Sequence, residues 1–214
     1  MSTQRLPQPL CAGLAAAAFL LIGCGGNTSL PQTFGPAQSR SILAPITQSD
    51  PHFAVTSTTF ENDKRVPQSM VYNGIAGSTC TGGDKSPQLS WHGAPSATHS
   101  YTVLMFDVTA SFTHWGMYNI PASTTSLPEN AGVAGSTFGP QVINDFFAAA
   151  KYDGPCPPPG LVHHYVITVF AIDCTLDLPS PPGFPPVGET LLYALLEGRA
   201  HIIATTSITG LYST

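Results

Sequence analysis

The sequence predicts a mainly β fold, one antiparallel β domain with a peripheral helix near its C-terminal end. Only 9% of the 214 residues are charged, and the chain holds 20 glycines and 21 prolines. That composition favours short strands and turns over long helices. Because 43% of the residues are hydrophobic, the chain is too apolar to be disordered throughout. Several apolar segments are also rich in β-branched and aromatic residues, as strands are.

The expected strands are apolar segments bounded by turn-forming residues. The segment "YTVLMFDV" (101–108) is apolar almost throughout, which predicts a central strand buried on both faces. The other strands are expected at "HFAVTSTTF" (52–60), "HWGMYNI" (114–120), "HHYVITVFAI" (163–172) and "IIATTSITGLY" (202–212).

One helix is expected within "GETLLYALLEGRAH" (188–201). Leu191, Leu192, Leu195 and Leu196 recur at a spacing that places them along one helix face. The preceding segment, "PSPPGFPPVG" (179–188), has the composition of a loop. The helix is therefore expected at the edge of the β domain.

Residues 1–23 have the pattern of a bacterial lipoprotein signal peptide. Arg5 precedes an apolar run, 10–22, that is too short to cross a membrane as a helix. The run leads into "LIGC" (21–24), which resembles a lipobox, so Cys24 is the expected acylated mature N-terminus, carrying chains such as palmitate. A plain secretory signal with a nearby cleavage site is the alternative.

The remainder of the chain divides into a tether and a folded domain. Residues 24–51 are rich in Gln, Ser, Thr, Pro and Gly, which predicts a flexible tether, and the domain then covers 52–214. The residue after the cysteine is Gly25 rather than an aspartate, and in this the sequence resembles lipoproteins that are sorted to the outer membrane. We therefore expect a lipid-anchored protein of the bacterial cell envelope, on the outer membrane and facing the periplasm.

The charge of the chain argues against nucleic acid as a partner. The formal net charge is −5, and the seven Lys and Arg residues are spread thinly. A nucleic-acid-binding domain needs clustered basic residues to neutralise phosphates. The expected lipid anchor, rather than electrostatic docking, accounts for membrane association.

The segment "GPCPPPGLVHHY" (154–165) combines a rigid backbone with titratable rings. Prolines at 155, 157, 158 and 159 fix φ and stiffen the segment before any ligand arrives. Because His163 and His164 are adjacent on an expected strand, their side chains point to opposite faces, and at most one can face a given pocket. A stiff surface turn leading into an ordinary strand is the alternative to a binding site.

This segment and five others resemble the phosphatidylethanolamine-binding protein family, in its bacterial Raf-kinase-inhibitor-like branch. The other pieces occur in the family's order: "VYNGIAGSTCTGGDKSPQLSWHGAP" (71–95), "SYTVLMFDV" (100–108), "HWGMYNIPASTTSLPENAG" (114–132), "NDF" (144–146) and "GLYS" (210–213). The resemblance covers roughly Phe53 to Ser213. It implies a large central antiparallel sheet packed by a smaller sheet, with helix at the C-terminus.

The resemblance also implies a small cavity that binds a phosphate-like group. Its expected ligand-binding residues here are Asp107, His114, Gly154, Cys156, Pro157, Pro158, His163 and Tyr165. The two histidine rings and the tyrosine hydroxyl are hydrogen-bond donors that an anion in a partly desolvated hole needs. The Asp107 carboxylate can orient a histidine and favour its protonated form, although it can equally cap a turn.

The chain departs from the family at one wall of this cavity. Where the family usually has Asp-Pro-Asp-Ala-Pro, this chain has "DVTAS" (107–111), with Thr109 in place of the second carboxylate and Ser111 in place of the closing proline. The loop before "HW" is also shortened. The fold expectation survives these changes, but the family's ligand preference does not carry over.

The cysteines of an exported domain favour disulfides. Bacterial relatives often carry cysteines in "GCTG"-like and "GPCPP" segments, matched here by Cys80 and Cys156, so the resemblance implies a Cys80–Cys156 bridge with Cys174 free. Pairing of Cys156 with Cys174 is the competing prediction.

Three classes of function remain at this stage. The leading hypothesis is a non-enzymatic module that binds a small anionic or phosphorylated group, without cofactor or metal. The second is a protein-interaction module that inhibits a protease or another envelope partner, with the proline-rich loops at 155–159 and 179–186 as rigid contacts. An enzyme is the least favoured, because the chain has no metal-binding His-x-x-x-His or Cys-x-x-Cys spacing and no Gly-x-Ser-x-Gly motif.

Overall fold

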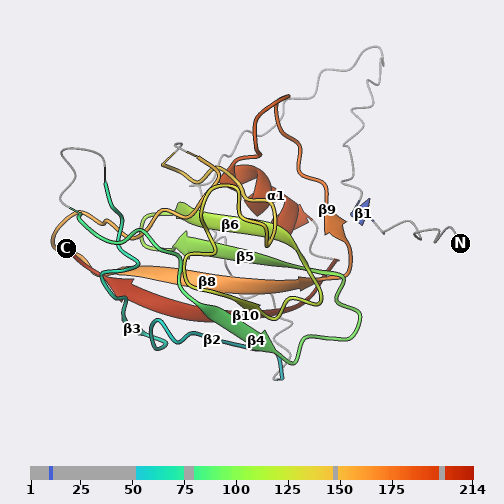
Figure 1. Ribbon diagram of the computed structural model, residues 1–214, viewed down its shortest axis with the longest axis horizontal. Coiled ribbons are helices and arrows are strands. Elements are labelled where there is room, and N and C mark those ends of the chain that lie inside the picture. The colour runs from blue at the N-terminus through green and yellow to red at the C-terminus, as the bar shows by residue number, and fades with distance from the viewer. Residues whose placement is uncertain (1–9, 12–51, 75–79, 147–148, 198–200) are drawn as a thin grey trace, which may run out of the picture. The chain divides into compact units, whose positions relative to one another are not determined.

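A five-stranded sheet in the order β3-β10-β8-β5-β6 faces a three-stranded sheet in the order β2-β4-β7 (Figure 1). The computed structural model describes residues 10–11, 52–74, 80–146, 149–197 and 201–214. A third, two-stranded sheet pairs β1 with β9. The strands are β1 (Leu10–Cys11), β2 (Ala54–Thr56), β3 (Lys64–Arg65), β4 (Leu89–His92), β5 (Ser100–Asp107), β6 (Phe112–Pro121), β7 (Ser126–Leu127), β8 (His163–Ile172), β9 (Thr175–Leu176) and β10 (Ile202–Tyr212).

The mainly β prediction is confirmed, and its long strands are placed almost residue for residue. β8 and β10 coincide with the predicted segments, and they pair antiparallel along their whole length, from Tyr212 opposite His163 to Ile202 opposite Ile172. β2 is shorter than its predicted segment, and the short strands β3, β4, β7 and β9 were not predicted. The large sheet is antiparallel except at one edge, where β3 pairs parallel with β10.

The main core lies between the large and the small sheet. β5 is buried along its entire length, and since side chains alternate across a strand, it contributes to both faces of its sheet. Val103 and Met105 belong to the cluster that also contains Leu89 and Trp91 of β4. A hydrogen bond from the Val55 N–H to the Thr206 hydroxyl, 3.1 Å, also joins the two sheets.

The helix α1 (Gly188–Glu197) packs beside β6 and lies within the predicted segment (Figure 1). Leu191 and Leu195 are buried, while Tyr193 on the outer face is exposed. A Cβ atom on Gly116 of β6 would lie 2.7 Å from the Leu191 Cδ2. Glycine at position 116 therefore allows the helix to approach the strand closely.

The expected signal peptide and tether, including Cys24, lie outside the described residues except for β1. The backbone of β1 pairs parallel with β9, with Cys11 opposite Leu176. Among the described residues, no helix is long and apolar enough to cross a membrane.

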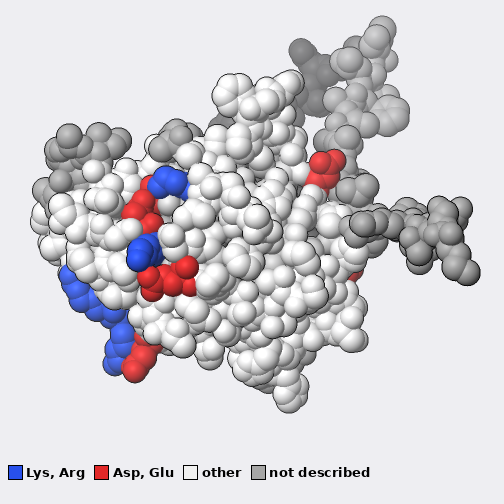
Figure 2. Space-filling model, viewed as in Figure 1, with Lys and Arg blue, Asp and Glu red and all other residues white. Residues whose placement is uncertain are grey.

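Charged side chains cover a small part of the face shown in Figure 2. Among the charged residues, Lys85 and Glu129 form an exposed pair, with the Lys85 Nζ 3.7 Å from the Glu129 Oε1. Such an exposed pair contributes little to stability.

Candidate functional site

The candidate site forms where three strands of the large sheet meet. In the register of the sheet, Asp107 at the end of β5 lies opposite both Tyr165 near the start of β8 and Phe112 at the start of β6. The turn from β5 to β6 is tight, so His114 follows two residues later on the neighbouring strand. Antiparallel pairing thus brings together side chains that are more than 50 residues apart in the chain.

A cavity of about 200 Å³ lies at this end of the sheet. Its lining residues are Asp107, Ala110, Phe112, His114, Phe146, Cys156, Pro157, Pro158, His163 and Tyr165. Seven of the eight residues that the resemblance implied are among them. The eighth, Gly154, is not a lining residue; it packs closely against the backbone of Met70 and Tyr72. Drug-sized pockets begin at about 300 Å³, so this cavity suits a small group.

Asp107 both orients a histidine and closes a turn. Its Oδ2 lies 2.6 Å from the Nδ1 of His163, and both side chains are buried. Its Oδ1 accepts hydrogen bonds from the backbone N–H groups of Thr109, 2.9 Å, and Ala110, 3.1 Å. The carboxylate fixes Nδ1 as a protonated nitrogen of His163, which leaves Nε2 as the ring nitrogen available to a ligand.

The Tyr165 hydroxyl makes no hydrogen bond of ordinary length and angle among the described residues, and the polar side chain near it is the Asp107 carboxylate. The side chain is fully buried. Burial first, and then the nearby Asp107 carboxylate, raise the pKa of the phenol, so the group keeps its proton at neutral pH. Leaving a buried hydroxyl unpaired costs roughly 1–3 kcal/mol, which is typical of a group that awaits a ligand or a water molecule.

His114 differs from the expectation that it donates a hydrogen bond to the ligand. Its Nδ1 lies 2.8 Å from the backbone carbonyl oxygen of Asp153. Since a carbonyl oxygen can only accept, Nδ1 carries the proton. Burial lowers the pKa of His114 to about 4, so the ring is neutral at pH 7 and its Nε2 is an acceptor.

Aromatic rings form the apolar part of the wall. The ring of Phe112 lies 4.9 Å from those of both His114 and Phe146, and Tyr72 stacks on the outer side of Phe146 at 4.5 Å. The His163 and His114 rings also contact Tyr165, with centroids 6.3 and 5.1 Å apart. These contacts restrict the rings to one arrangement and keep water from much of the wall.

His164 is exposed, whereas His163 before it is buried in the pocket wall. The alternation predicted for these two neighbours is therefore present. The backbone N–H of His164 donates to the Thr109 hydroxyl, 3.1 Å. Thr109, which replaces the family's second carboxylate, thus ties the β5–β6 turn to β8, and Ser111 adopts a φ of 55° in the same turn.

The "GPCPP" loop is held against the segment that precedes β4. A disulfide joins Cys80 to Cys156, the pair implied by the resemblance. The Tyr72 N–H donates to the Pro155 carbonyl, 3.1 Å, and a Cβ atom on Gly154 would lie 1.9 Å from the Met70 carbonyl oxygen. Only glycine fits at position 154 without moving one of these two backbones.

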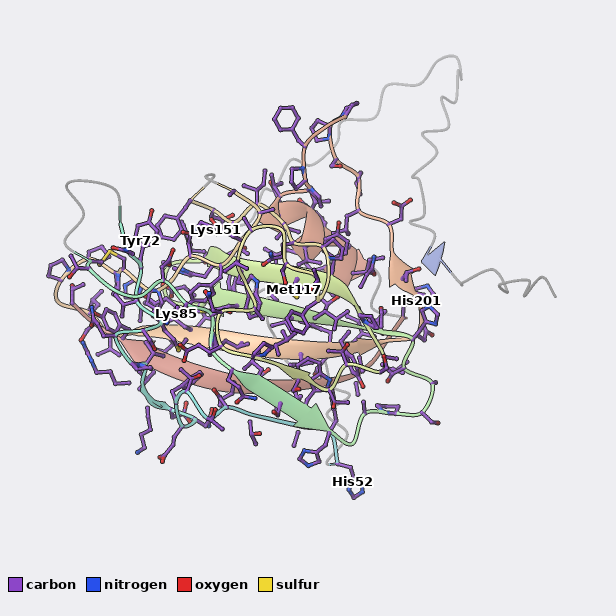
Figure 3. All side chains as sticks on the ribbon, in the orientation of Figure 1. His52, Tyr72, Lys85, Met117, Lys151 and His201 are labelled. Carbon is purple, nitrogen blue, oxygen red and sulfur yellow. A yellow bond between two sulfur atoms is a disulfide. The ribbon has the colours of Figure 1, made fainter. Side chains whose placement is uncertain are left out.

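A charged network behind the loop was not predicted from the sequence. Lys151 contacts both Asp153 and Asp84, the latter at 3.0 Å. Asp84 accepts from the Gly154 N–H, 2.8 Å, and Asn144 donates to Asp153, 2.7 Å. Figure 3 shows Lys151 and Tyr72 toward one end of the large sheet, with His201 toward the other.

The network fixes the position of the carbonyl that binds His114, because Asp153 supplies both that carbonyl and a buried carboxylate. The sequence contains one signal that could have found it. In a chain with only 9% charged residues, "KYDG" (151–154) places a lysine and an aspartate directly before the loop.

The prediction that Cys174 is free is wrong, because Cys174 is disulfide-bonded in the structure. The competing pairing with Cys156 is also wrong, since Cys156 pairs with Cys80. Among the described residues, Asp173, Cys174 and His201 are the three metal-ligand side chains whose atoms lie within 4.8 Å of one another. A disulfide sulfur is not the thiolate that binds a metal, so this group lacks its sulfur ligand.

The comparisons with known proteins agree with this architecture. A family model described as phosphatidylethanolamine-binding protein matches residues 56–213. The chain belongs to this family. The bacterial relatives fit the expected branch of it, and they include the UPF0098 protein YbcL of Escherichia coli (strain K12), which is 36% identical over 169 residues that cover 75% of this chain and 87% of YbcL. A UPF0098 protein of Aquifex aeolicus is 36% identical over 163 residues, 74% of this chain and 86% of that protein.

Solved structures of family members share the fold. The crystal structure of E. coli YbcL, described as a new member of the mammalian PEBP family, matches with a TM-score of 0.64 at 35% identity, covering 76% of this chain and 99% of YbcL. A putative phosphatidylethanolamine-binding protein homolog from Chlamydia trachomatis, CT736, matches with a TM-score of 0.59 at 26% identity, covering 78% and 99%. Two packed sheets with a C-terminal helix are therefore the family's fold in this chain.

Proposed function

We propose that this chain is a non-enzymatic binding protein whose cavity takes a small anionic group, such as phosphate or a phosphate head group. The observation that carries the proposal is the unpaired buried hydroxyl of Tyr165 in the same cavity wall as the Asp107–His163 pair. Both groups can present a donor to one anion, His163 through its Nε2 when the ring carries both protons.

The proposal is for binding rather than for catalysis because the cysteine in the wall is blocked. Cys156 lines the cavity, but its sulfur is in a disulfide and cannot attack a substrate. His114 Nδ1 is held by a backbone carbonyl, and His163 Nδ1 by Asp107. This arrangement fixes both rings in place, which suits a rigid receptor for an anion.

Isothermal titration calorimetry with inorganic phosphate and phosphorylethanolamine tests the proposal. The wild-type protein should bind at least one of them, and His163→Asn and Tyr165→Phe should each weaken binding about 10- to 100-fold, as the loss of one charge-assisted hydrogen bond does. His164→Asn is the matched control, because it removes a neighbouring but exposed histidine. Binding that survives both pocket variants, or that fails for every phosphate compound, contradicts the proposal.

We further propose that acyl chains on Cys24 hold the protein to the bacterial cell envelope, on the outer membrane and facing the periplasm. The support is the lipobox-like "LIGC" and the short apolar run before it. Processing before Cys24 would remove Cys11, and acylation would occupy the Cys24 sulfur. A plain secretory signal would leave the new N-terminus without acyl chains.

The intact mass of protein purified from its own cells decides between these forms. The expected result is a chain that begins at Cys24 and carries acyl mass. A chain that retains Cys11 and carries no acyl mass would contradict the anchor, and cleavage without acyl mass would support the plain secretory signal.

The alternative function is a protein contact that inhibits a protease or another envelope partner. The observation that favours it is the loop before α1, in which residues 179–185 are exposed and Phe184 is 66% exposed. The other proline-rich loop, 155–159, is less available, because Pro155 and Pro157 are buried. An inhibition assay with purified envelope proteases tests this: Phe184→Ser should relieve inhibition and leave phosphate binding unchanged, and no inhibition by the wild type would reject it.

A further inference from the structure

The polar groups of the cavity are not all donors, and this limits which anions fit. Two ring nitrogens already make hydrogen bonds within the protein: His163 Nδ1 with Asp107 at 2.6 Å, and His114 Nδ1 with the Asp153 carbonyl at 2.8 Å. The nitrogen left for a ligand is Nε2 in each ring. His163 and Tyr165 can offer donors, while neutral His114 offers a lone pair.

The fixed charge around His114 does not favour a doubly charged ligand. The groups that face its ring are Asp107 from β5, His163 and Tyr165 from β8, and the backbone carbonyls of Asp153 and Gly154 from the loop. None of the described residues that line the cavity is Lys or Arg. The lysine of the region, Lys151, is directed to Asp84 and Asp153. With Asp107 charged, the lining is at best neutral when His163 is protonated.

We propose that the cavity selects an oxyanion that still carries a proton, such as dihydrogen phosphate or a singly protonated phosphomonoester, and that His114 Nε2 accepts that proton's hydrogen bond. The inference rests on the proposed function and narrows its ligand. Tyr165 and protonated His163 donate to two oxygens of the anion, and the P–O–H group of the ligand donates to His114. Sulfate at neutral pH and phosphodiesters have no such proton, so each leaves a buried lone pair of His114 facing an anionic oxygen.

Protonation of His114 itself is a poor way to accommodate a proton-free anion. Burial holds the pKa of the ring at about 4, so charging it at pH 7 would lower affinity on the order of a thousandfold. A ligand that supplies its own proton avoids this loss. The result is a site that tells phosphate from sulfate although the two ions have the same shape.

Calorimetric titrations at pH 6, where about half of a phosphomonoester carries its proton, test the inference with four probes: inorganic phosphate, methyl phosphate, sulfate and dimethyl phosphate. Phosphate and methyl phosphate should bind at least about tenfold more tightly than sulfate and dimethyl phosphate, as for one unmatched hydrogen bond. Because a phosphomonoester loses its last proton near pH 6, the ratio of methyl phosphate to sulfate affinity should fall as the pH rises from 6 to 8.

Two variants separate the role of His114 from a general loss of the site. In His114→Gln the side-chain amide can turn to donate, so the preference for phosphate over sulfate should shrink. Tyr165→Phe removes a donor that both anions use, so both affinities should fall by similar factors and the ratio should persist.

Each outcome decides between the inference and the proposed function. Equal binding of sulfate and phosphate to the wild type overturns the inference and leaves the anion pocket standing. A preference for phosphate that is unchanged in His114→Gln also overturns it, because another group then accepts the proton. If none of the four probes binds, the anion pocket fails and the inference fails with it.

Discussion

Acidification should destabilise the folded protein through His114, and His114→Gln should remove that part of the pH dependence. The ring is 4% exposed, and its pKa is about 4 in the fold, whereas an unperturbed histidine titrates near 6.5. Above about pH 6.5, the folded and unfolded states are both neutral at this position. As the pH falls below that value, the unfolded chain binds a proton that the folded protein does not, so the free energy of unfolding falls.

The loss should be complete near pH 4. A difference of about 2.5 pKa units between the two states corresponds to roughly 3 kcal/mol of unfolding free energy. Urea unfolding of the wild type and His114→Gln at intervals between pH 7.5 and 4 measures it. The variant will be less stable at pH 7, because it loses ring contacts. Between pH 7 and 4, however, its free energy of unfolding should fall by roughly 3 kcal/mol less than that of the wild type.

The control is His164→Gln, which removes an exposed histidine of the same sequence neighbourhood. Its stability should follow the wild-type curve. If wild type and His114→Gln lose stability in parallel down to pH 4, the ring is not held neutral by burial, and the acceptor role assigned to His114 is lost with it.

Three further predictions concern the support of the pocket. Serine at both Cys80 and Cys156 should lower the free energy of unfolding by about 4 kcal/mol, from loop closure over a separation of 76 residues, and a loss under 1 kcal/mol in urea unfolding would contradict this. Gly154→Ala should cost about 3 kcal/mol or more, because its Cβ meets the backbone, and a melting temperature like that of the wild type would refute the close approach. Lys151→Met should cost about 3 kcal/mol by leaving buried Asp153 without its cation, and adding Asp153→Asn should recover most of the loss. A double variant as unstable as Lys151→Met would show that the charge pair is not the cause.

A matched glycine serves as control for position 154. A Cβ atom on Gly116 would also be too close to its neighbours, but these are the side-chain ends of Val142 and Leu191, which can move. Gly116→Ala should therefore cost less than Gly154→Ala. The opposite order would mean that the loop backbone yields more easily than the packing under α1.

The long strands were predictable because their residues carry the signal themselves. β8 and β10 are rich in β-branched and aromatic residues, and burial on both faces of β5 follows from its apolar sequence. β3 and β9 have two residues each and exist only because a neighbouring strand pairs with them. No local pattern of hydrophobicity can reveal such strands.

The residues that line the candidate cavity could be predicted from the sequence, but their protonation and hydrogen-bonding roles could not. Asp107, His163 and Tyr165 occur in segments that resemble the family, and strand alternation correctly separated His163 from His164. The tautomer of His114 depends on a carbonyl 39 residues away, which sequence reasoning could not place.

The supporting groups were missed for the same reason. Asp84 accepts a hydrogen bond from Gly154, which is 70 residues away in the chain. Phe146 lies in the cavity wall because the residue before it, Asp145, accepts a hydrogen bond of 2.7 Å from the Thr113 N–H of β6. Partners at these distances are fixed by the whole fold rather than by any one segment. The low content of charged residues could only indicate that the few charged side chains near the loop form ion pairs or hydrogen bonds, and not with which residues.

The central claim is that the Asp107–His163 pair, Tyr165 and His114 surround one anion. A phosphate titration followed by ¹⁵N NMR of the histidine ring nitrogens tests it most directly. The account predicts saturable shifts of the Nε2 signals of His163 and His114, with His114 protonated on Nδ1 throughout and exposed His92 and His164 unmoved. Unchanged His163 and His114 signals at saturating phosphate, or a His114 ring protonated on Nε2 alone, would contradict it.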